Sequence, residues 1–284
     1  MSQVRSKQAF VIPFMAFQVL VLVHSLWRAW STGLAPVWVG PLVVAAAFLS
    51  FMGWMVGSGA ARTGARLPGL LAVSGGGVLV ALLGAAFGST PRVTVPVTYA
   101  FFAFGSQLLY VFWYSRLDRT PSEALRVGAL LPDLLLEDEQ GRAVSSKEFL
   151  GSPAVLLFYR GNWCPLCMAQ IRELSEEYKD LAARGAKVIL VSPQFHAQTR
   201  ELAARFRVPF HFLVDPGGRA ARQLGILHEA GVPLGIGGYD PDTVFPTAVV
   251  TDATGRILLA DQTDNYRVRP EPATFVAALD GARP

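Results

Sequence analysis

The sequence predicts two regions of different fold class, a transmembrane bundle of four α-helices followed by an α/β domain. The first observation is the charge distribution: residues 1–117 hold seven basic side chains and no acid, and all twenty-one acids lie at or beyond Asp118. The second is that the first region carries four uncharged apolar runs, each of roughly 18–21 residues and long enough to cross a bilayer as a helix. The third is that short apolar runs alternate with amphipathic stretches after residue 128, which indicates β-α-β organisation. We therefore expect a membrane domain over 1–117, a linker over 118–127 and an α/β domain over 128–284.

The expected spans are residues 10–27, 37–56, 67–87 and 95–114. A cleaved signal peptide is the alternative for the first run, but no small-x-small cleavage site is evident and three more runs follow. The third run contains Gly75-Gly-Gly77, which weakens a helix. Gln18 and His24 are polar residues within the first span, and we expect them to form hydrogen bonds to neighbouring helices.

Basic residues near the span ends predict the orientation in the membrane. With four spans, one face would carry seven of them and the other only two, Arg28 and Arg92. The seven are Arg5, Lys7, Arg62, Arg66, Arg116, Arg119 and Arg126. The positive-inside rule then places both ends of the chain, and so the α/β domain, on the cytoplasmic side of an inner or plasma membrane. The same distribution explains the pI of about 9.3 without a nucleic-acid partner, since the basic residues form no cluster or stripe.

The α/β domain is expected to hold strands at 154–159, 187–192, 210–214, 247–251 and 256–260. Helices are expected at 168–184, 198–206, 218–224 and 273–279. Between the first strand and the first helix lies Tyr159-Arg-Gly-Asn-Trp-Cys-Pro-Leu-Cys167, which contains both cysteines of the chain.

This strand-to-helix turn favours a reactive cysteine. Pro165 falls at about the first helical position, where its missing N–H costs nothing. Cys164 would then lie at the helix N-terminus, where free amides and the helix dipole favour a thiolate, and Arg160 adds a positive charge. We therefore expect Cys164 to be the more acidic thiol.

Two alternatives to a redox dithiol are a zinc site and a purely structural pair. Zinc needs about four ligands, but the sequence has no second Cys-x-x-Cys and its four histidines are scattered. A pair of buried structural cysteines would not require Trp163-Cys-Pro-Leu-Cys at such a turn. We therefore expect a redox pair without metal. The sequence also has no heme, nucleotide or phosphate motif, so no cofactor is expected.

Residues 128–284 resemble the thioredoxin fold, and within it the redoxins of the alkyl hydroperoxide reductase/thiol-specific antioxidant (peroxiredoxin-like) family. The residues that carry the resemblance are Gly128-x-x-x-Pro-Asp133, Asp138-x-x-Gly141, Phe158-Tyr-Arg-Gly-Asn-Trp-Cys-Pro-Leu-Cys167, Phe245-Pro-Thr247, Asp252-x-x-Gly255 and Tyr266-Arg-Val-Arg-Pro270.

The resemblance implies roles for several residues. Cys164 would be the attacking cysteine and Cys167 the resolving one, with Arg160, Asn162, Trp163 and Pro165 supporting the site. Pro246 would match the family's cis-proline; an ordinary proline at the start of a strand is the alternative. The family's Pro-x-x-x-Thr/Ser-x-x-Cys pattern, counted back from Cys164, falls on Leu157 and Gly161, so the sequence departs from it there. Arg160 and the backbone amides around Asn162 are the expected substitutes for stabilising an oxygen anion.

Three functions remain open at this stage. The first is a membrane-anchored peroxidase that reduces hydroperoxides through a Cys164/Cys167 dithiol–disulfide cycle. The second is a thiol–disulfide oxidoreductase that acts on protein disulfides, and the third is a membrane redox sensor. The expected partners are a hydroperoxide or protein disulfide, a thioredoxin-like or low-molecular-weight thiol as electron donor, and the lipid bilayer. A homo-oligomer is compatible with the resemblance.

Overall fold

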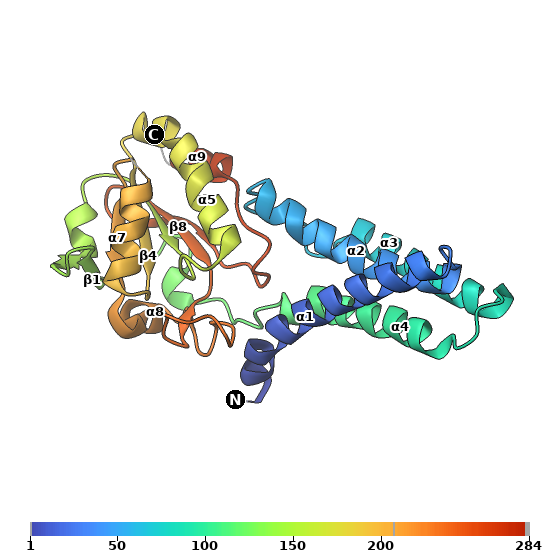
Figure 1. Cartoon of the computed structure of the whole chain (residues 1–284). Coiled ribbons are helices and arrows are strands. Elements are labelled where there is room, and N and C mark those ends of the chain that lie inside the picture. Colours follow the sequence, from blue (N-terminus) through green and yellow to red (C-terminus); the bar gives the residue numbers. More distant parts are fainter. Residues whose placement is uncertain (1, 207, 282–284) are drawn as a thin grey trace. The chain divides into compact units, whose positions relative to one another are not determined.

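The computed structural model describes residues 2–206 and 208–281 (Figure 1). The chain divides into two compact units. A helical unit contains residues 9–60 and 64–116, and an α/β unit is formed mainly by the chain from residue 117 onward.

The helical unit contains four long helices, α1–α4. Each is long and apolar enough to cross a membrane. Their bounds are α1 Ser2–Ser31, α2 Pro36–Gly57, α3 Pro68–Phe87 and α4 Thr94–Leu109, the last continued by a π-helical turn, η1 Tyr110–Tyr114. The four helices coincide with the four runs expected from the sequence, and α1 begins well before residue 10.

Glycines in α2 and α3 explain why the glycine-rich third run forms a helix. A Cβ on Gly77 would lie 2.8 Å from Val44 Cγ2, and one on Gly84 would lie 2.4 Å from the backbone nitrogen of Val37. A Cβ on Gly40 would lie 2.5 Å from Ala81 Cβ. The glycines therefore allow α2 and α3 to approach closely, and this packing offsets their low helix propensity.

A buried polar network connects all four helices at mid-bundle. Gln18 Nε2 of α1 donates to Ala103 O of α4 at 3.1 Å, and Gln107 Nε2 of α4 donates to Val44 O of α2 at 2.9 Å. Ser74 Oγ of α3 donates to Gln107 Oε1 at 2.7 Å. The hydrogen bonds expected for the first span are confirmed, since His24 Nδ1 also lies 3.0 Å from Tyr99 Oη of α4.

The α/β unit is built on a seven-stranded sheet among the described residues, with strand order β2-β1-β5-β4-β3-β8-β9. Strands β3, β4 and β5 run parallel to one another, and the other neighbours are antiparallel. The bounds are β1 Leu135–Asp138, β2 Ala143–Ser145, β3 Ala154–Phe158, β4 Lys187–Ser192, β5 His211–Val214, β8 Thr247–Thr251 and β9 Ile257–Asp261. A separate two-stranded sheet pairs β6 Leu227–His228 with β7 Thr243–Val244.

Helices cover both faces of the seven-stranded sheet. In Figure 1 strands β4 and β8 lie between helix α7 (His196–Arg205) on one side and helices α5 (Pro165–Glu176) and α9 (Pro272–Asp280) on the other. The helices are α5 Pro165–Glu176, α6 Tyr178–Ala182, α7 His196–Arg205, α8 Arg219–Gln223 and α9 Pro272–Asp280, with short 3₁₀ turns η2 Glu123–Leu125, η3 Ser146–Phe149 and η4 Pro216–Gly218. The main core packs apolar residues of β1, β3, β4 and β5 against α8 and the turn η2.

The strands expected from the sequence are present within one residue at each end, but two differences matter. The expected helix 168–184 is interrupted at Glu177, which separates α5 from α6. The expected linker 118–127 contributes the completely buried Leu125 to the core, because the turn η2 packs its side chain inward. The sequence analysis also does not predict the β1–β2 hairpin or the β6–β7 pair.

Candidate active site

The two cysteines lie just after strand β3, at the start of helix α5. Cys164 is the N-cap residue of α5 and Pro165 is its first residue, as the sequence predicts. Cys167 lies in the first turn of the helix. Both thiols are free, and the two residues are only 2% and 0% exposed. The pair therefore occupies a helix N-terminus but is shielded from solvent.

A buried arginine, Arg269, contacts both sulfurs. Its Nη2 lies 3.5 Å from Cys167 Sγ and 3.9 Å from Cys164 Sγ. Nη1 donates to Gln170 Oε1 of α5 at 3.0 Å, and Nε donates to the backbone carbonyl of Tyr266 at 3.2 Å. The contacts of Nη1 and Nε hold the guanidinium against the two sulfurs, and its positive charge favours a thiolate.

A second guanidinium, that of Arg160, lies in the loop before Cys164. Its Nη2 donates to the carbonyl of Gly231 at 2.6 Å, and its Cζ lies 4.6 Å from the ring centre of Trp163 and 5.6 Å from that of Tyr266. Arg160 is 6% exposed. Among the ion pairs formed by described residues, none involves Arg160 or Arg269.

The contacts at the site favour Cys167 as the more acidic thiol, whereas the sequence analysis expects Cys164. Burial alone would raise the pKa of Cys167, but a hydrogen bond from Cys164, the charge of Arg269 and the backbone amide of Arg160 lower it to about 5. Burial and the hydrogen bond to Cys167 raise the pKa of Cys164 well above its ordinary value. The sequence analysis considered only the helix N-terminus and Arg160, and not a guanidinium that approaches Cys167 from a distant segment.

The loop before Cys164 is held by Gln194, which follows β4. Gln194 Oε1 accepts from the backbone N–H of Asn162 at 2.9 Å, and its Nε2 donates to Tyr159 Oη at 3.0 Å and Thr199 Oγ1 at 3.1 Å. Burial, and then the negative charge of Cys167, raise the pKa of Tyr159, so its hydroxyl stays protonated. The Asn162 amide, expected to face an oxygen anion, is instead bonded to Gln194.

Pro246 lies near the thiol site, but its peptide bond is not cis. No cis peptide bond occurs among the described residues, so the sequence-based expectation for Phe245–Pro246 was wrong. Pro246 leads into strand β8 as an ordinary strand-start proline, with its carbonyl accepting from Arg119 Nη1 at 3.1 Å and the Phe245 carbonyl accepting from Thr247 Oγ1 at 2.9 Å. The trans form is the intrinsically favoured one. Pro246 lines a small cavity together with Gln170 and Arg269.

The structure thus brings together the sequence-predicted residues Arg160, Asn162, Trp163, Cys164, Pro165 and Cys167 in one loop and helix start. Sequence reasoning did not identify Arg269, Gln170 or Gln194 as site residues. The one available signal was the Tyr266-Arg-Val-Arg-Pro270 segment, in which two arginines alternate with an apolar residue.

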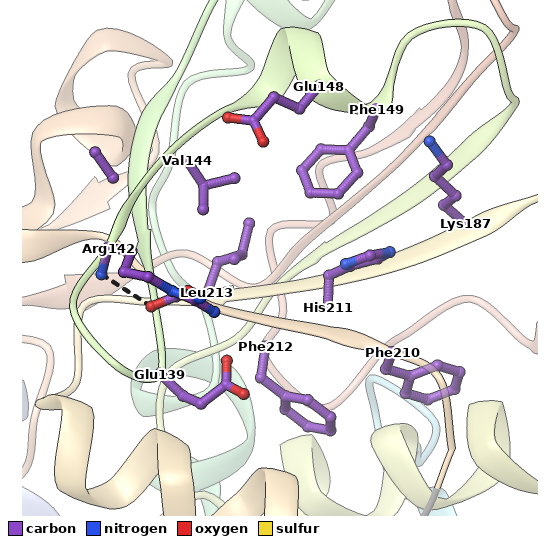
Figure 2. Close-up of a pocket in the computed structure, with 12 residues that line it drawn as sticks. Glu139, Arg142, Val144, Glu148, Phe149, Lys187, Phe210, His211, Phe212 and Leu213 are labelled. Atoms are coloured by element: carbon purple, nitrogen blue, oxygen red, sulfur yellow. Dashed lines mark hydrogen bonds and ion pairs between the residues drawn. The ribbon is translucent and has the colours of Figure 1, made fainter.

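A separate cleft of about 570 Å³ lies elsewhere on the α/β unit (Figure 2). It is lined by the β1–β2 hairpin, by Glu148 and Phe149, and by Lys187 and His211 at the beginnings of β4 and β5. The cysteines follow the end of β3, which is parallel to β4. The cleft therefore lies at the opposite edge of the sheet from the thiols.

Within the described residues, no group of three or more His, Cys, Asp or Glu side chains could hold a metal ion. The chemistry available at the site is that of two thiols beside two guanidiniums.

Comparisons with known proteins identify relatives of the α/β unit. The model of the AhpC/TSA family matches residues 127–277. Peroxiredoxin Q, chloroplastic, from Oryza sativa subsp. japonica is 32% identical over 99 residues, which cover 35% of this chain and 46% of that protein. Peroxiredoxin Q, chloroplastic, from Arabidopsis thaliana is 29% identical over 128 residues, which cover 43% of this chain and 59% of that protein. The chain spans about half the length of the curated relatives that it matches.

Solved structures align with about half of the chain. Peroxidoxin BcpB from Mycobacterium tuberculosis aligns with a TM-score of 0.47 and 21% identity, covering 56% of this chain and 99% of that one. AhpC from Enterococcus faecalis aligns with a TM-score of 0.46 and 20% identity, covering 55% of this chain and 91% of that one.

Proposed function

Because the chain belongs to the AhpC/TSA family, we propose that it is a thiol peroxidase whose reactive groups are Cys164 and Cys167. The observation that carries this proposal is the buried guanidinium of Arg269, 3.5 Å from Cys167 Sγ, beside a second thiol. A thiolate is the reactive form of cysteine, and a fixed cation beside it favours both the thiolate and a developing oxygen anion.

Cys167 is the attacking cysteine in this proposal and Cys164 the resolving one, the reverse of the roles implied by the sequence resemblance. The lowered pKa of Cys167 and its shorter distance to Arg269 support this assignment. Counted back from Cys167, the family pattern Pro-x-x-x-Thr/Ser-x-x-Cys puts Arg160 at the Pro position and Cys164 at the Thr/Ser position, so the sequence departs from the pattern at both. Cys164 still supplies a hydrogen bond to Cys167, as a hydroxyl at the Thr/Ser position would.

The first step forms an S–O bond and breaks the O–O bond of the hydroperoxide. The Cys167 thiolate attacks the terminal peroxide oxygen, and Cys167 becomes a sulfenic acid that carries the proton of that oxygen. The alkoxide leaves and takes a proton from water. Arg269 stabilises the charge that moves from sulfur to oxygen. In the second step Cys164 attacks the Cys167 sulfur, water leaves, and a disulfide forms. Two electrons and two protons from an external thiol donor then restore the dithiol.

The test is hydroperoxide consumption by the full-length protein in detergent, with Cys167→Ser and Cys164→Ser variants. We expect the wild type to consume hydrogen peroxide repeatedly when dithiothreitol is present. Cys167→Ser should lose this activity, whereas Cys164→Ser should form a sulfenic acid on Cys167 that dimedone traps. The proposal fails if the wild type consumes no hydroperoxide, and the assignment of roles fails if Cys167→Ser carries the trapped sulfenic acid.

The Cys-x-x-Cys spacing at a helix start also favours a second candidate, exchange with protein disulfides. The burial of both sulfurs counts against it, because a protein disulfide has to reach one of them. Turnover of a reporter protein disulfide faster than of hydrogen peroxide would favour this candidate.

The four apolar helices further support the proposal that the helical unit anchors the enzyme in a lipid bilayer. The distribution of basic residues near the helix ends favours a cytoplasmic α/β unit. Reporter fusions after residues 60, 90 and 284, one active only in the cytoplasm and one only outside, test this topology. Cytoplasmic signals at 60 and 284 with an external signal at 90 are expected, and an external signal at 284 would contradict the proposal.

A further inference from the structure

The charge balance of the thiol site changes when the cysteines are oxidised. In the reduced protein, the guanidinium of Arg269 lies 3.5 Å from Cys167 Sγ, and the charges of Arg269 and Arg160 both favour the Cys167 thiolate. Asp261 lines the same small cavity as Arg269 but forms no ion pair with it. A disulfide carries no charge, so oxidation leaves two buried cations without their anion. Burying an unpaired charge is costly, and the oxidised site therefore favours an incoming anion.

The loop before Cys164 also holds donors that no acceptor uses. Arg160 is only 6% exposed, and its Nε has no hydrogen-bond partner. The indole Nε1 of the adjacent Trp163 is buried without a partner as well. Unused buried donors are rare in folded proteins because each costs free energy. A guanidinium Nε beside a stacked indole is a suitable place for a carboxylate, which guanidinium groups bind with charge-assisted hydrogen bonds.

We propose that the reductant of the oxidised enzyme is a low-molecular-weight thiol that carries a carboxylate, and that Arg160 binds this carboxylate. The inference rests on the proposed Cys164/Cys167 cycle. The burial of both cysteines favours a small donor over a protein, because a small thiol needs less opening of the loop to reach sulfur. Arg160 then acts only after oxidation, when the site has lost its own anion.

The electron balance is that of two successive thiol–disulfide exchanges. The thiolate of the first donor molecule attacks one sulfur of the Cys164–Cys167 disulfide, which forms a mixed disulfide and releases the other cysteine as a thiolate. A second donor molecule attacks the donor's own sulfur in the mixed disulfide. The products are the enzyme dithiol and the donor disulfide, so two donor molecules supply the two electrons.

The experiment compares 3-mercaptopropionate with its neutral amide, 3-mercaptopropionamide, as reductants of the full-length protein in detergent. The protein is first oxidised with diamide, so that reduction is measured without any hydroperoxide. Recovery of free thiols is followed by acid quenching and alkylation, and rates are compared at equal concentrations of thiolate. We expect the carboxylate to react about tenfold faster or more, the effect of one charge-assisted hydrogen bond. Added salt should reduce this preference.

Variants assign the preference to Arg160. In Arg160→Gln the ratio of the two rates should fall to about one, whereas Arg160→Lys should keep part of it. The control, Arg222→Gln, removes an exposed arginine of α8 and should keep the full ratio. The rate with the amide thiol shows whether the disulfide of each variant can still be reduced. A misfolded variant is recognised because both rates are lost and its thermal midpoint falls.

The proposal is overturned if the wild type reacts with 3-mercaptopropionate no faster than with 3-mercaptopropionamide. It is also overturned if the preference for the carboxylate persists in Arg160→Gln. A failure of the proposed peroxidase activity gives a different result. The diamide-oxidised protein then still reacts faster with the carboxylate thiol, but hydrogen peroxide does not oxidise the dithiol.

Discussion

Arg269 Nη2 lies 3.5 Å from Cys167 Sγ, although 102 residues separate the two in the sequence. The guanidinium is held in place by Gln170 of α5 and by the carbonyl of Tyr266. The contact joins the start of α5 to the segment between β9 and α9. It is this tertiary contact, together with the hydrogen bond from Cys164, that lowers the pKa of Cys167 in a buried position where desolvation alone would raise it.

Replacing Arg269 should therefore make Cys167 less acidic. In Arg269→Gln we expect the pKa of Cys167 to rise by about one to three pH units, the usual effect of one nearby opposite charge. A rise from about 5 to about 8 would leave roughly a tenth of the thiolate at pH 7 and slow the reaction with hydroperoxide about tenfold. The pH dependence of thiolate absorbance in the reduced protein measures the change.

The matched control for this prediction is Arg222→Gln, at an exposed arginine of α8. It should leave the titration of the thiols unchanged. An unchanged midpoint in Arg269→Gln would show that the guanidinium does not stabilise the thiolate.

The lowered pKa of Cys167 also predicts how stability depends on pH. Below about pH 5 the thiol is protonated in the folded and in the unfolded protein. Between about pH 5 and its ordinary value of 9.0, only the folded protein holds the thiolate, so the unfolded chain binds more protons. The free energy of unfolding of the reduced wild type, relative to Cys167→Ser, should then rise by about 1.4 kcal/mol per pH unit across this range.

Thermal unfolding of both proteins at a series of pH values checks this prediction. The stabilisation should be complete above about pH 9 and should be lost as the pH falls through about 5. Oxidised wild type has no thiolate, so its stability should lack this dependence. A constant difference between reduced wild type and Cys167→Ser would refute the thiolate assignment.

The parts of the site that depend on neighbouring residues could be predicted from the sequence. The apolar run before the cysteines forms β3, and Pro165 and the periodicity after it form α5, because a buried strand and a helix start depend mainly on neighbouring residues. The four apolar runs were equally clear from length and lack of charge.

The parts that depend on distant segments could not be predicted. No pattern near Arg269 or Gln194 shows that their side chains meet the cysteine loop, because that meeting follows from the packing of α5 and β4 with the segment after β9. The contact of Arg269 with the two thiols, which favours Cys167 as the more acidic one, was missed for the same reason. The inward packing of Leu125 was missed because a polar segment with a proline is typical of a linker, and its single apolar side chain gave no periodicity.

Gln194 should control access to the thiols. In Gln194→Leu the Asn162 amide and the Tyr159 hydroxyl lose their partner, and an unsatisfied buried group costs about 1–3 kcal/mol. We expect a lower thermal midpoint and faster alkylation of the native dithiol by iodoacetamide, as the loop opens more often. Gln140→Leu is the matched control, since Gln140 makes only exposed side-chain contacts. Equal alkylation rates in the two variants would exclude a role for Gln194 in closing the loop.

The close approach of α2 and α3 gives the last prediction, which compares Gly84→Ala with Gly76→Ala in the same helix. Alanine favours a helix over glycine by about 1 kcal/mol, so the helix itself gains in both variants. A Cβ on Gly84 would lie 2.4 Å from the backbone nitrogen of Val37, whereas a Cβ on Gly76 meets nothing within 4 Å. Because the backbone of α2 cannot move aside as a side chain can, Gly84→Ala has to separate the helices and lose their packing, at a cost of about 1–3 kcal/mol.

The thermal midpoint of the detergent-solubilised protein, followed by tryptophan fluorescence, should fall for Gly84→Ala and stay equal or rise for Gly76→Ala. Five of the six tryptophans lie in residues 1–116, so this signal reports mainly on the helical unit. Equal midpoints for the two variants would show that α2 and α3 do not pack as closely as described.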